Sequence, residues 1–591
     1  MGELIERSFE FYSRRPCVGY RKKTSEAPSF EEQYTWLTFQ QLHYLSHQFG
    51  NGLRTYLGTS ERAFIGICSL NRIEWIVSDF GASMKGMIVV PIHHYLTEET
   101  ISMIIDNTKL ECVVCSQELL PKFEKFSSKC PSLKHIVVFP DQLGGTFEKL
   151  VESSSESTKP EHFCEEKPQF KVSFERVLKE GKRSPLKNHV VKLKPEDIYT
   201  IIFSSGSSGI AKGAVFTDKT VKHTVAHQLR TTFDPLVQIS KDSLAYVSVC
   251  IFLEMIEEKN SKLRKIKDRE TVLATFFKGG RTGIASNGIT NIFEDLQILN
   301  PNTLAATPKF WNFLYSEHAR LLSQMRSENK EESSKIIEKM ADENIKTKLG
   351  KRLAYIAIGG AMSNDEVKRF LKRVFGFEPS DGYGTTESGA IANESGRIYA
   401  GVEYKIVSVP DLGYFEYDTP PRGELWVKPK HGVSEYYNNT KETSKAFQEG
   451  WFNTGDIVEL VSKDTIKIID RSSSFFKLSQ GVFVTPQKLE TIYCHSPLIS
   501  QIFITCADVR KFQPNNVTAV IVPTETALQT HKDEQELQNK VFSTFSTLKN
   551  ISSSLKLAFF KDFRVNEGDW KSTKIAGVRN SFSNIFGKGA F

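Results

Sequence analysis

Residues 198–213 read IYTIIFSSGSSGIAKG, and this stretch indicates the fold. Its first six residues are apolar, aromatic or β-branched, which is typical of a strand buried inside a parallel sheet. The small residues that follow allow backbone N–H groups to close around an anion, and Lys212 adds a point charge. A Ser/Gly-rich loop alone is more often a flexible linker, but the strand before it and the lysine after it favour a phosphate-binding loop. It differs from the P-loop of nucleotidases, because Gly213 follows Lys212 where that motif requires Ser or Thr.

Similar apolar runs recur through the first 460 residues and alternate with amphipathic helical patterns; they lie at 63–70, 87–92, 111–116 and 135–140. Helical segments such as EWIVSDFGASMKG (74–86) would supply the crossovers between parallel strands. The sequence therefore predicts an α/β fold. Cys112 and Cys115 form a lone CxxC pair inside the run 111–116. Because no second pair accompanies them, we interpret them as part of a buried strand and not as a zinc site.

The composition is that of a large globular chain. With 591 residues, 39% hydrophobic and 25% charged, the chain is long enough for two or more packed units. The 77 basic and 70 acidic side chains leave a formal charge of +7 without a dense basic block, so we expect no nucleic-acid partner. Nine scattered cysteines suit a reducing interior, and the N-terminus has no apolar core of a secretory signal.

Two segments differ in composition from the alternating pattern around them. Residues 151–167 are rich in Ser and Glu and predict a solvated surface excursion. Residues 324–346 are strongly charged with Ile and Met at helical spacing, which favours a solvated amphipathic helix over a partner-binding helix.

Further motifs follow the phosphate-loop candidate in order along the chain. They are TPKFWNFLY (307–315), AIGGAMSNDEVKRFL (357–371), DGYGTTESG (381–389) and, within residues 423–490, the segments GELWVK, EGWFNTGDIVEL and IKIIDRSSSFFKLSQGVFVTPQKLE. Together with 204–213 they resemble the adenylate-forming, AMP-binding superfamily, and within it the long-chain fatty acyl-CoA synthetases. The resemblance covers roughly residues 8–580. It implies a large α/β part of several subdomains over 1–470, and a small, mobile α+β cap over 471–591 that rotates about an Asp-Arg hinge.

The motif DGYGTTESG offers three groups suited to a metal–nucleotide complex. Tyr383 presents a flat face for a purine, Thr386 a hydroxyl for phosphate, and Glu387 a carboxylate for Mg²⁺. By the resemblance, Glu387 holds the magnesium ion that bridges the ATP phosphates. The alternative is a tight Gly-rich turn with an exposed glutamate.

The later motifs carry residues for the ribose. Asp456 can accept hydrogen bonds from the two ribose hydroxyls, although a helix N-cap would use the same residue type. Arg471, by the resemblance, reaches the same ribose, although an Asp-Arg dipeptide is usually a surface ion pair. The nucleotide-binding set that the resemblance implies is Ser204, Ser205, Gly206, Ser207, Ser208, Gly209, Lys212, Gly360, Ala361, Tyr383, Gly384, Asp456 and Arg471.

The resemblance implies a long-chain-fatty-acid–CoA ligase that uses ATP, Mg²⁺ and coenzyme A. In that family a fatty carboxylate attacks ATP to give an acyl-adenylate, and the CoA thiol then displaces AMP. Glu387, Thr386 and a C-terminal lysine would be the catalytic residues.

The sequence departs from the family pattern on the CoA side and near the C-terminus. The family's C-terminal lysine motif appears as DWKSTKIAGVRN (569–580), which places Ile575 or Ala576 at the lysine position; we expect the adjacent Lys574 to substitute. Other departures are Ile251 and Asp218 at histidine positions, Val482 at a glutamate position, and Ser472 at the hinge lysine position.

These departures leave three hypotheses open. The first is a working long-chain acyl-CoA synthetase. The second is a catalytically weakened homologue that acts as a nucleotide- or acyl-binding or assembly protein. The third is an adenylating enzyme that passes its acyl group to an acceptor other than CoA. For a synthetase we expect a fatty acid and CoA as small-molecule partners, and a location in the cytoplasm or at the periphery of an organelle membrane.

Overall fold

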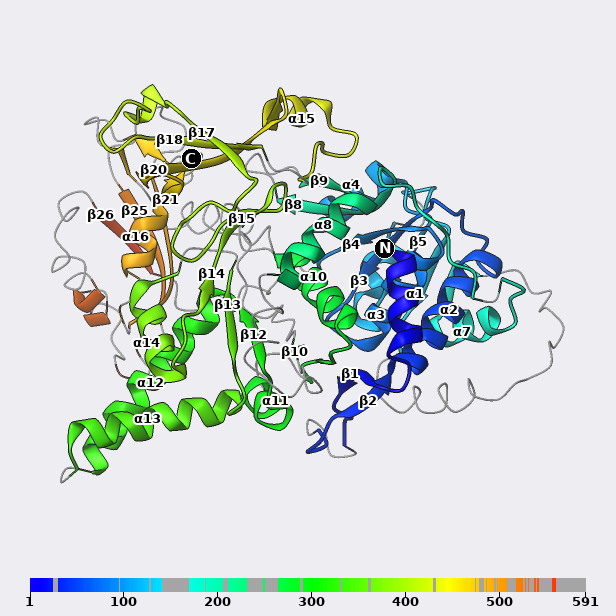
Figure 1. Cartoon of the computed structure of the whole chain (residues 1–591), viewed down its shortest axis with the longest axis horizontal. Helices are drawn as coiled ribbons and strands as arrows, with labels where there is room; N and C mark the ends of the chain where they lie inside the picture. The colour runs from blue at the N-terminus through cyan, green and yellow to red at the C-terminus, as the bar shows by residue number, and fades with distance from the viewer. Residues whose placement is uncertain are drawn as a thin grey trace. The chain divides into compact units, whose positions relative to one another are not determined.

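A computed structural model of the chain describes residues 1–559 with interruptions (Figure 1). The residues it does not describe within that range are 25–29, 95, 127–128, 141–168, 187, 206–210, 231–247, 250–263, 287–290, 330–331, 360–362, 429–431, 473–474, 478–482, 485, 494–495, 497, 507–516, 524–526, 528–529, 531–535, 538 and 542–554. The chain divides into two compact units. The first unit is Met1–Glu394 with Pro429–Phe447, and the second is Ser395–Lys428 with Gln448–Phe591.

The first unit contains a seven-stranded sheet with the strand order β7-β6-β5-β3-β4-β8-β9. Its neighbouring strands run parallel, except that β8 and β9 form an antiparallel hairpin. The strands are β3 (Phe64–Cys68), β4 (Ile88–Pro91), β5 (Cys112–Cys115), β6 (His135–Val138), β7 (Lys171–Ser173), β8 (Ile198–Ser205) and β9 (Ala211–Thr217). Residues of β4, β5 and β6 are buried at every position, as expected of Val- and Ile-rich strands covered on both faces. The predicted α/β fold is confirmed.

Helices cover both faces of this sheet (Figure 1). One face packs against α1 (Gly2–Phe11), α2 (Phe39–Thr55), α3 (Ile73–Met84), α7 (Phe174–Lys182), α8 (Asp218–Gln228) and α10 (Arg264–Phe277). The other face packs against α4 (Glu98–Thr108), the short turn η1 (Gln117–Leu119) and α5 (Leu120–Glu124). The helix predicted at 74–86 is α3, which connects the parallel strands β3 and β4 as expected.

Cys112 and Cys115 are free, buried thiols at the two ends of β5. Side chains three positions apart on a strand point to opposite faces of the sheet. Accordingly, Cys112 packs in the core under α2 and α3, whereas Cys115 packs in the core under α4 and α5. Burial raises the pKa of Cys112 to about 12. The two thiols therefore cannot share a metal ion, and the interpretation of a buried strand is confirmed.

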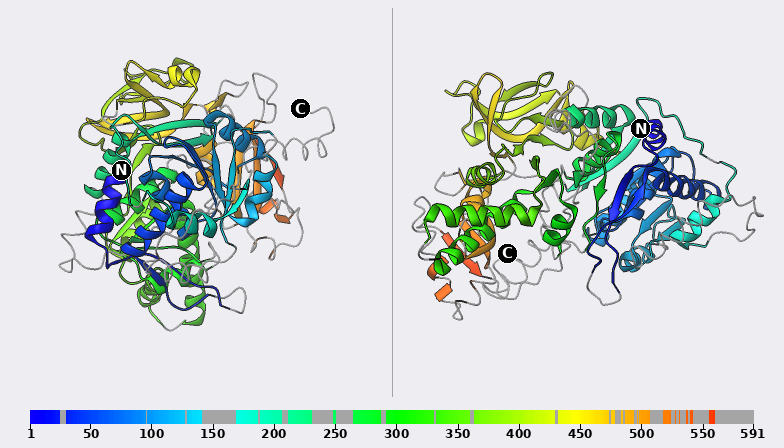
Figure 2. Two further views of the ribbon diagram at one scale, coloured as in Figure 1. Left: turned by 90° about the vertical axis from the view of Figure 1, so that its right-hand side faces the viewer. Right: turned by 60° about the horizontal axis from the view of Figure 1, so that its bottom comes forward.

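A second, four-stranded parallel sheet in the first unit has the order β10-β12-β13-β14. Its strands are β10 (Ser248–Val249), β12 (Thr303–Ala306), β13 (Tyr355–Ile358) and β14 (Ser380–Asp381). It packs with helices α11 (Ile292–Leu299), α12 (Pro308–Glu328), α13 (Ser334–Leu349) and α14 (Asp365–Phe375) around a core of its own (Figure 1 and Figure 2). Trp311 of the motif at 307–315 is fully buried there, in the first turn of α12.

The single amphipathic helix predicted over residues 324–346 is wrong. The chain leaves α12 at Asn329 and begins α13 at Ser334, so the segment is split between two helices. Ile337 and Ile345 are buried because α13 packs against α12, whereas Ile336 and Met340 are about half exposed. Charge and spacing indicated helix correctly but did not reveal the turn between the two helices.

Among the described residues, the first unit also contains two small sheets and one short helix. A three-stranded sheet joins β1 (Pro16–Tyr20), β2 (Thr35–Thr38) and β11 (Thr282–Gly283). A hairpin joins β15 (Tyr383–Thr385) to β16 (Gly389–Ala392), and the helix is α15 (Thr440–Ala446).

The second unit begins with an antiparallel sheet and continues into an α+β part. The antiparallel sheet comprises β17 (Glu403–Val407), β18 (Arg422–Lys428), β20 (Trp451–Ser462) and β21 (Thr465–Arg471), with β19 (Phe447–Gln448) at the unit boundary and η3 (Pro410–Leu412) between β17 and β18. The later elements are β22 (Phe476–Lys477), β23 (Phe483–Val484), α16 (Pro486–Tyr493), β24 (Ile499–Cys506), β25 (Val517–Pro523) and β26 (Leu555–Phe559). Strands β24 to β26 form one sheet that shares a small core with α16.

The boundaries of the compact units fall within residues 394–448, and not at 470. The predicted division into a large part, 1–470, and a small mobile cap, 471–591, stays a prediction. The surface excursion predicted at 151–167 lies outside the described residues. Among the helices described, none combines the length and apolar character needed to cross a membrane.

Candidate functional site

The phosphate-loop candidate lies at the turn of the β8–β9 hairpin. Ser204 pairs with Lys212 and Ser205 with Ala211, so five residues connect the two strands. Those five residues include the predicted Gly206, Ser207, Ser208 and Gly209, which lie outside the described part of the chain. The predicted order is therefore present: a strand, a connection and then a lysine. Lys212 is the second residue of β9.

Lys212 is largely buried and contacts two residues from a distant segment. Its Nζ atom forms an ion pair with Glu442 of α15. The same nitrogen lies over the ring of Tyr436, 5.4 Å from the ring centroid. Hydrogen bonds from Lys212 and Lys445 lower the pKa of Glu442 to about 2, so this carboxylate stays charged at any physiological pH.

The motif DGYGTTESG forms the β15–β16 hairpin and the turn between its strands. Thr385 and Ser388 brace the turn, because the Thr385 hydroxyl accepts a hydrogen bond from Ser388 N at 3.0 Å and lies 2.9 Å from its hydroxyl. Gly384 is required by a close approach, since a Cβ there would lie 2.2 Å from the Gly389 carbonyl oxygen. Tyr383 begins β15 and is half-buried.

Glu387 is buried inside this turn. It is 5% exposed, and the neighbouring Thr386 is 1% exposed. The Glu387 Oε1 atom accepts a hydrogen bond of 2.8 Å from the Tyr436 hydroxyl. The alternative of an exposed glutamate on a tight turn is therefore wrong.

The sequence did not identify Tyr436, which links these two parts of the site. The segment 433–437 lies along β9: Val215 N donates to Glu435 O at 3.3 Å, and Tyr437 N donates to Gly213 O at 2.7 Å. A further backbone bond of 2.7 Å runs from Val433 N to Glu387 O. The local signal was the pair of tyrosines shortly before Asn439, the N-cap of α15, and such a pair does not specify its partners.

The surroundings of Glu387 fit a divalent cation. Magnesium binds carboxylate oxygens together with water and substrate phosphates. Among the described residues, the Glu387 side chain receives one hydrogen bond, from Tyr436 to Oε1, and Oε2 receives none. A carboxylate held by a single neutral donor keeps acceptor positions for a metal ion, so Glu387 is a suitable ligand.

The ribose candidates meet within the second unit. Asp456 of β20 pairs with Arg471 of β21 in the strand register, and Arg471 Nε lies 3.0 Å from Asp456 Oδ1. Asp456 is buried in the middle of a strand, so the alternative of a helix N-cap is wrong. The Arg471 side chain pairs with Asp456 across the two strands, and its backbone N–H donates to Asp470 Oδ1 at 2.7 Å.

The hinge candidate Ser472 is held by its neighbours in the same unit. Its hydroxyl donates to the Gly455 carbonyl oxygen at 3.2 Å. Gly455 lies beside Asp456, so this bond ties the end of β21 to the ribose candidates.

Several predicted site residues fall outside the described residues. They are Gly360, Ala361 and Lys574, together with the departures Ile251, Val482, Ile575 and Ala576. Of the other departures, Asp218 is buried as the first residue of α8, where its carboxylate pairs with Lys222 at 2.5 Å.

A cluster on α1 and α2 offers three potential metal ligands. His43 Nε2 and His47 Nε2 lie 2.9 Å and 2.8 Å from the carboxylate oxygens of Glu6. However, Lys85 Nζ lies 3.2 Å from His47 Nδ1, and burial lowers the pKa of this lysine to about 8. A buried ammonium group at that distance repels a metal ion, so we interpret the cluster as a structural hydrogen-bond network.

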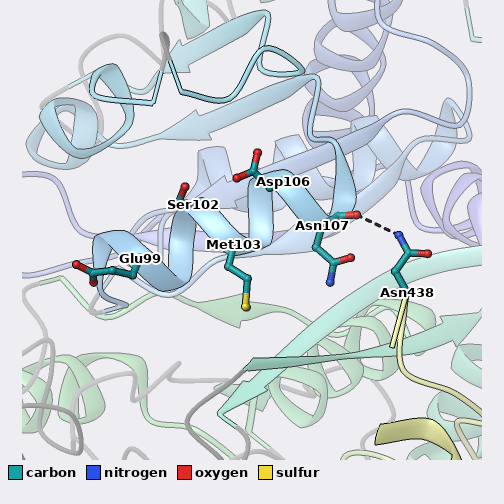
Figure 3. Close-up of a pocket in the computed structure, with 6 residues that line it drawn as sticks. All are labelled: Glu99, Ser102, Met103, Asp106, Asn107 and Asn438. Carbon is teal, nitrogen blue, oxygen red and sulfur yellow. Dashed lines mark hydrogen bonds between the residues drawn. The ribbon is translucent and has the colours of Figure 1, made fainter. Parts of the chain in front are cut away.

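One open pocket, of about 720 Å³, lies along α4 in the first unit (Figure 3). Its lining residues are Glu99, Ser102, Met103, Asp106, Asn107 and Asn438. It contains none of the predicted site residues. Its relevance is that Asn438 Nδ2 donates to the Asn107 carbonyl oxygen at 3.2 Å, which anchors the segment carrying Tyr436 (Figure 3).

The fold of the chain is that of an adenylate-forming enzyme. The A domain of carboxylic acid reductase from Segniliparus rugosus, solved with AMP and a co-purified carboxylic acid, matches with a TM-score of 0.80 at 21% identity, over 99% of this chain and 93% of that one. Residues 18–437 match the family described as AMP-binding enzyme. The chain belongs to this AMP-binding enzyme family, and the resemblance seen in the sequence is confirmed.

Curated relatives carry names of fatty acyl-CoA synthetases. The chain is 27% identical over 500 residues to the peroxisomal long chain acyl-CoA synthetase 6 of Arabidopsis thaliana, which covers 80% of this chain and 66% of that protein. It is 26% identical over 558 residues to fatty acyl-CoA synthetase A of Dictyostelium discoideum, with coverages of 90% and 76%.

Proposed function

We propose that the chain activates a long-chain fatty acid in two steps at the expense of ATP. A carboxylate oxygen of the fatty acid attacks the α-phosphorus of ATP, the bond from that phosphorus to the bridging oxygen breaks, and pyrophosphate leaves. The sulfur of coenzyme A then attacks the acyl carbonyl carbon, the bond to the AMP oxygen breaks, and the thiol proton passes to solvent. The products are acyl-CoA, AMP and pyrophosphate.

The observation that carries this proposal is that Glu387 and Lys212 both contact the side chain of Tyr436. A carboxylate suited to Mg²⁺ and a lysine beside the phosphate loop lie on the same tyrosine, although they are far apart in sequence. Transfer at phosphorus depends mainly on positioning and charge neutralisation. Glu387 would hold Mg²⁺, which would supply positive charge against the ATP phosphates. Lys212, beside the connection between β8 and β9, would contact the same phosphates.

The remaining roles follow the family resemblance. We propose Tyr383, Gly384, Gly360 and Ala361 for the adenine, Thr386 for phosphate, and Asp456 with Arg471 for the ribose hydroxyls. The observed pairing of Asp456 with Arg471 supports the last assignment, because the arginine holds the acceptor carboxylate in place. Lys574 would supply the cation that meets the charge developing at the α-phosphate.

The departures at Ile251, Val482 and Ile575 favour a second candidate, a weakened homologue that binds nucleotide or acyl chains without efficient turnover. The two candidates share the nucleotide site and differ in chemistry. For a synthetase, we further propose a cytoplasmic location or peripheral contact with an organelle membrane, since its substrate is a lipid.

Pyrophosphate exchange tests the proposal. The full-length protein with ATP, Mg²⁺, oleate and labelled pyrophosphate should form labelled ATP, and omission of oleate should abolish the label. In parallel, ATP–Mg²⁺ at tenfold over its dissociation constant should stabilise the fold by about 1.4 kcal/mol in thermal unfolding. Pyrophosphate exchange without CoA-dependent release of AMP would support the adenylation step and contradict the transfer of the acyl group to CoA. Nucleotide stabilisation without exchange would favour the weakened homologue, and absence of both would overturn both candidates.

A further inference from the structure

Tyr436 makes two contacts to proposed nucleotide-site residues, and each uses a different part of its side chain. The hydroxyl donates to Glu387 Oε1 at 2.8 Å. The face of the ring lies 5.4 Å from Lys212 Nζ. The side chain is otherwise enclosed, since Tyr436 is 5% exposed and its ring packs against Phe447 at 5.7 Å between centroids.

The backbone around Tyr436 is held from several directions. A β-bridge pairs Tyr436 with Ala214 of β9, and Tyr436 N donates to the Thr443 hydroxyl at 3.0 Å. Asn438 is anchored to Asn107 at the end of α4. The tyrosine thus sits on a fixed backbone, so its side chain can hold its neighbours in place instead of following them.

We propose that Tyr436 is a positioning residue of the nucleotide site. Its hydroxyl fixes the rotation of the Glu387 carboxylate, so that Oε2 is presented to Mg²⁺, and its ring holds the Lys212 ammonium group beside the phosphate loop. This inference rests on the proposed function, and it adds a residue that touches neither the metal ion nor the nucleotide.

The physical basis lies in the fixed geometry that metal binding requires. Magnesium tolerates little deviation from octahedral coordination, so a carboxylate that rotates freely binds it less well. Hydrogen-bond partners behind a ligand typically account for about 10–100-fold in metal affinity. A cation over an aromatic face gains a further, smaller stabilisation.

Tyr436→Phe separates the two contacts, because it removes the hydroxyl and keeps the ring. The half-saturating Mg²⁺ concentration should rise by about tenfold, measured as the metal-dependent part of the thermal shift that ATP produces. The affinity for ATP in the absence of metal should stay unchanged, because the ring still holds Lys212. Pyrophosphate exchange at saturating Mg²⁺ should recover most of the wild-type rate.

Tyr437→Phe is the matched control, since it removes a hydroxyl from the adjacent tyrosine, whose ring packs against Phe64 at 5.3 Å. It should leave the Mg²⁺ dependence unchanged. Tyr436→Leu, which loses the ring as well, should in addition weaken metal-free ATP binding severalfold.

An unchanged Mg²⁺ requirement in Tyr436→Phe, with normal ATP–Mg²⁺ binding by the wild type, would overturn the inference and leave the proposed function standing. An equal rise in Tyr437→Phe would also overturn it, because the effect would then be general. If the wild type shows no response to ATP–Mg²⁺ at all, the inference and the proposed function fail together.

Discussion

Glu442 is the residue whose contact with Lys212 has the clearest consequence for binding. Its carboxylate forms an ion pair with the Lys212 ammonium group, which in the proposed function would contact the ATP phosphates. Glu442 would therefore compete with the phosphates for this lysine. Because the pKa of Glu442 is about 2, the carboxylate is not protonated at neutral pH, and protonation cannot break the ion pair. Glu442→Gln should therefore tighten ATP binding by about fivefold, which is the size of a partly exposed ion pair, in titration calorimetry.

Glu435→Gln is the control for Glu442→Gln, because Glu435 is an exposed residue of the same segment and gives the same change in net charge. It should leave ATP affinity unchanged. Weaker binding by Glu442→Gln would mean that Glu442 holds Lys212 in its working position instead of competing with phosphate.

Lys574 decides between catalysis and binding. If the first half-reaction proceeds, a cation must meet the charge that builds between the carboxylate and the α-phosphate, and the C-terminal motif offers Lys574 beside Ile575. Lys574→Ala should lower pyrophosphate exchange by about 10²–10³-fold while ATP affinity stays nearly constant. Lys571→Ala should have little effect, since Lys571 lies further from the family position. Full activity of Lys574→Ala would assign the step to another cation.

At the scale of elements, the sequence predicted what depends on short-range pattern. The run around Cys112 identified a buried strand because burial on both faces requires consecutive apolar residues. The order of β8, loop and Lys212 was equally readable, because it lies within one hairpin.

The contacts of Tyr436 and Glu442 could not be predicted, because they depend on how distant segments pair. Tyr436 reaches Glu387 across 49 residues, and only the pairing of segment 433–437 with β9 brings them together. The break between α12 and α13 was missed for a related reason. The polar turn has the same charged composition as the helices on either side of it.

The β15–β16 hairpin depends on Gly384. An alanine Cβ there would lie 2.2 Å from a backbone oxygen that cannot move independently of the opposite strand. Gly384→Ala should cost about 1–3 kcal/mol and lower the midpoint of thermal unfolding by a few degrees. Because the turn carries Glu387, the ATP–Mg²⁺ stabilisation should fall as well. An unchanged midpoint and an unchanged nucleotide response would show that the hairpin opens without strain.

The packing of α1 on α2 should depend on pH through Glu6. Burial disfavours the charged carboxyl, but hydrogen bonds from His43 and His47 outweigh it and lower the pKa from 4.5 to about 2. The resulting stability is present above pH 4.5 and is lost as the pH falls towards 2. Burial also lowers the pKa of His47 below 6.5. Protonation of His47 therefore also reduces the stability of the fold as the pH falls below 6.5.

Glu6→Gln tests this dependence. At pH 7 it should destabilise by on the order of 2 kcal/mol in urea unfolding, and the difference from wild type should shrink below pH 4.5. A difference that stays constant down to pH 3 would show that the carboxylate charge is not the stabilising element.

For the whole molecule, the sequence pattern predicts where a protease enters. Limited digestion should cut first in 151–167 or near Ser472–Ser474, where the chain is polar and lacks an apolar pattern. The segment 198–216 should resist, because β8 and β9 belong to the seven-stranded sheet. Mass spectrometry of the first fragments checks the order, and an initial cut inside 198–216 would contradict it.

The hairpin that joins β8 to β9 restricts how the phosphate loop can be altered. Its register sets Ser204 opposite Lys212 across a connection of five residues. Inserting or deleting one residue within β9 next to Lys212 would turn the lysine towards the opposite face of the sheet, because side chains alternate along a strand. Replacement of the loop's amino acids leaves that register intact. Mutant libraries aimed at this loop should therefore confine changes of length to the five connecting residues and leave β9 intact.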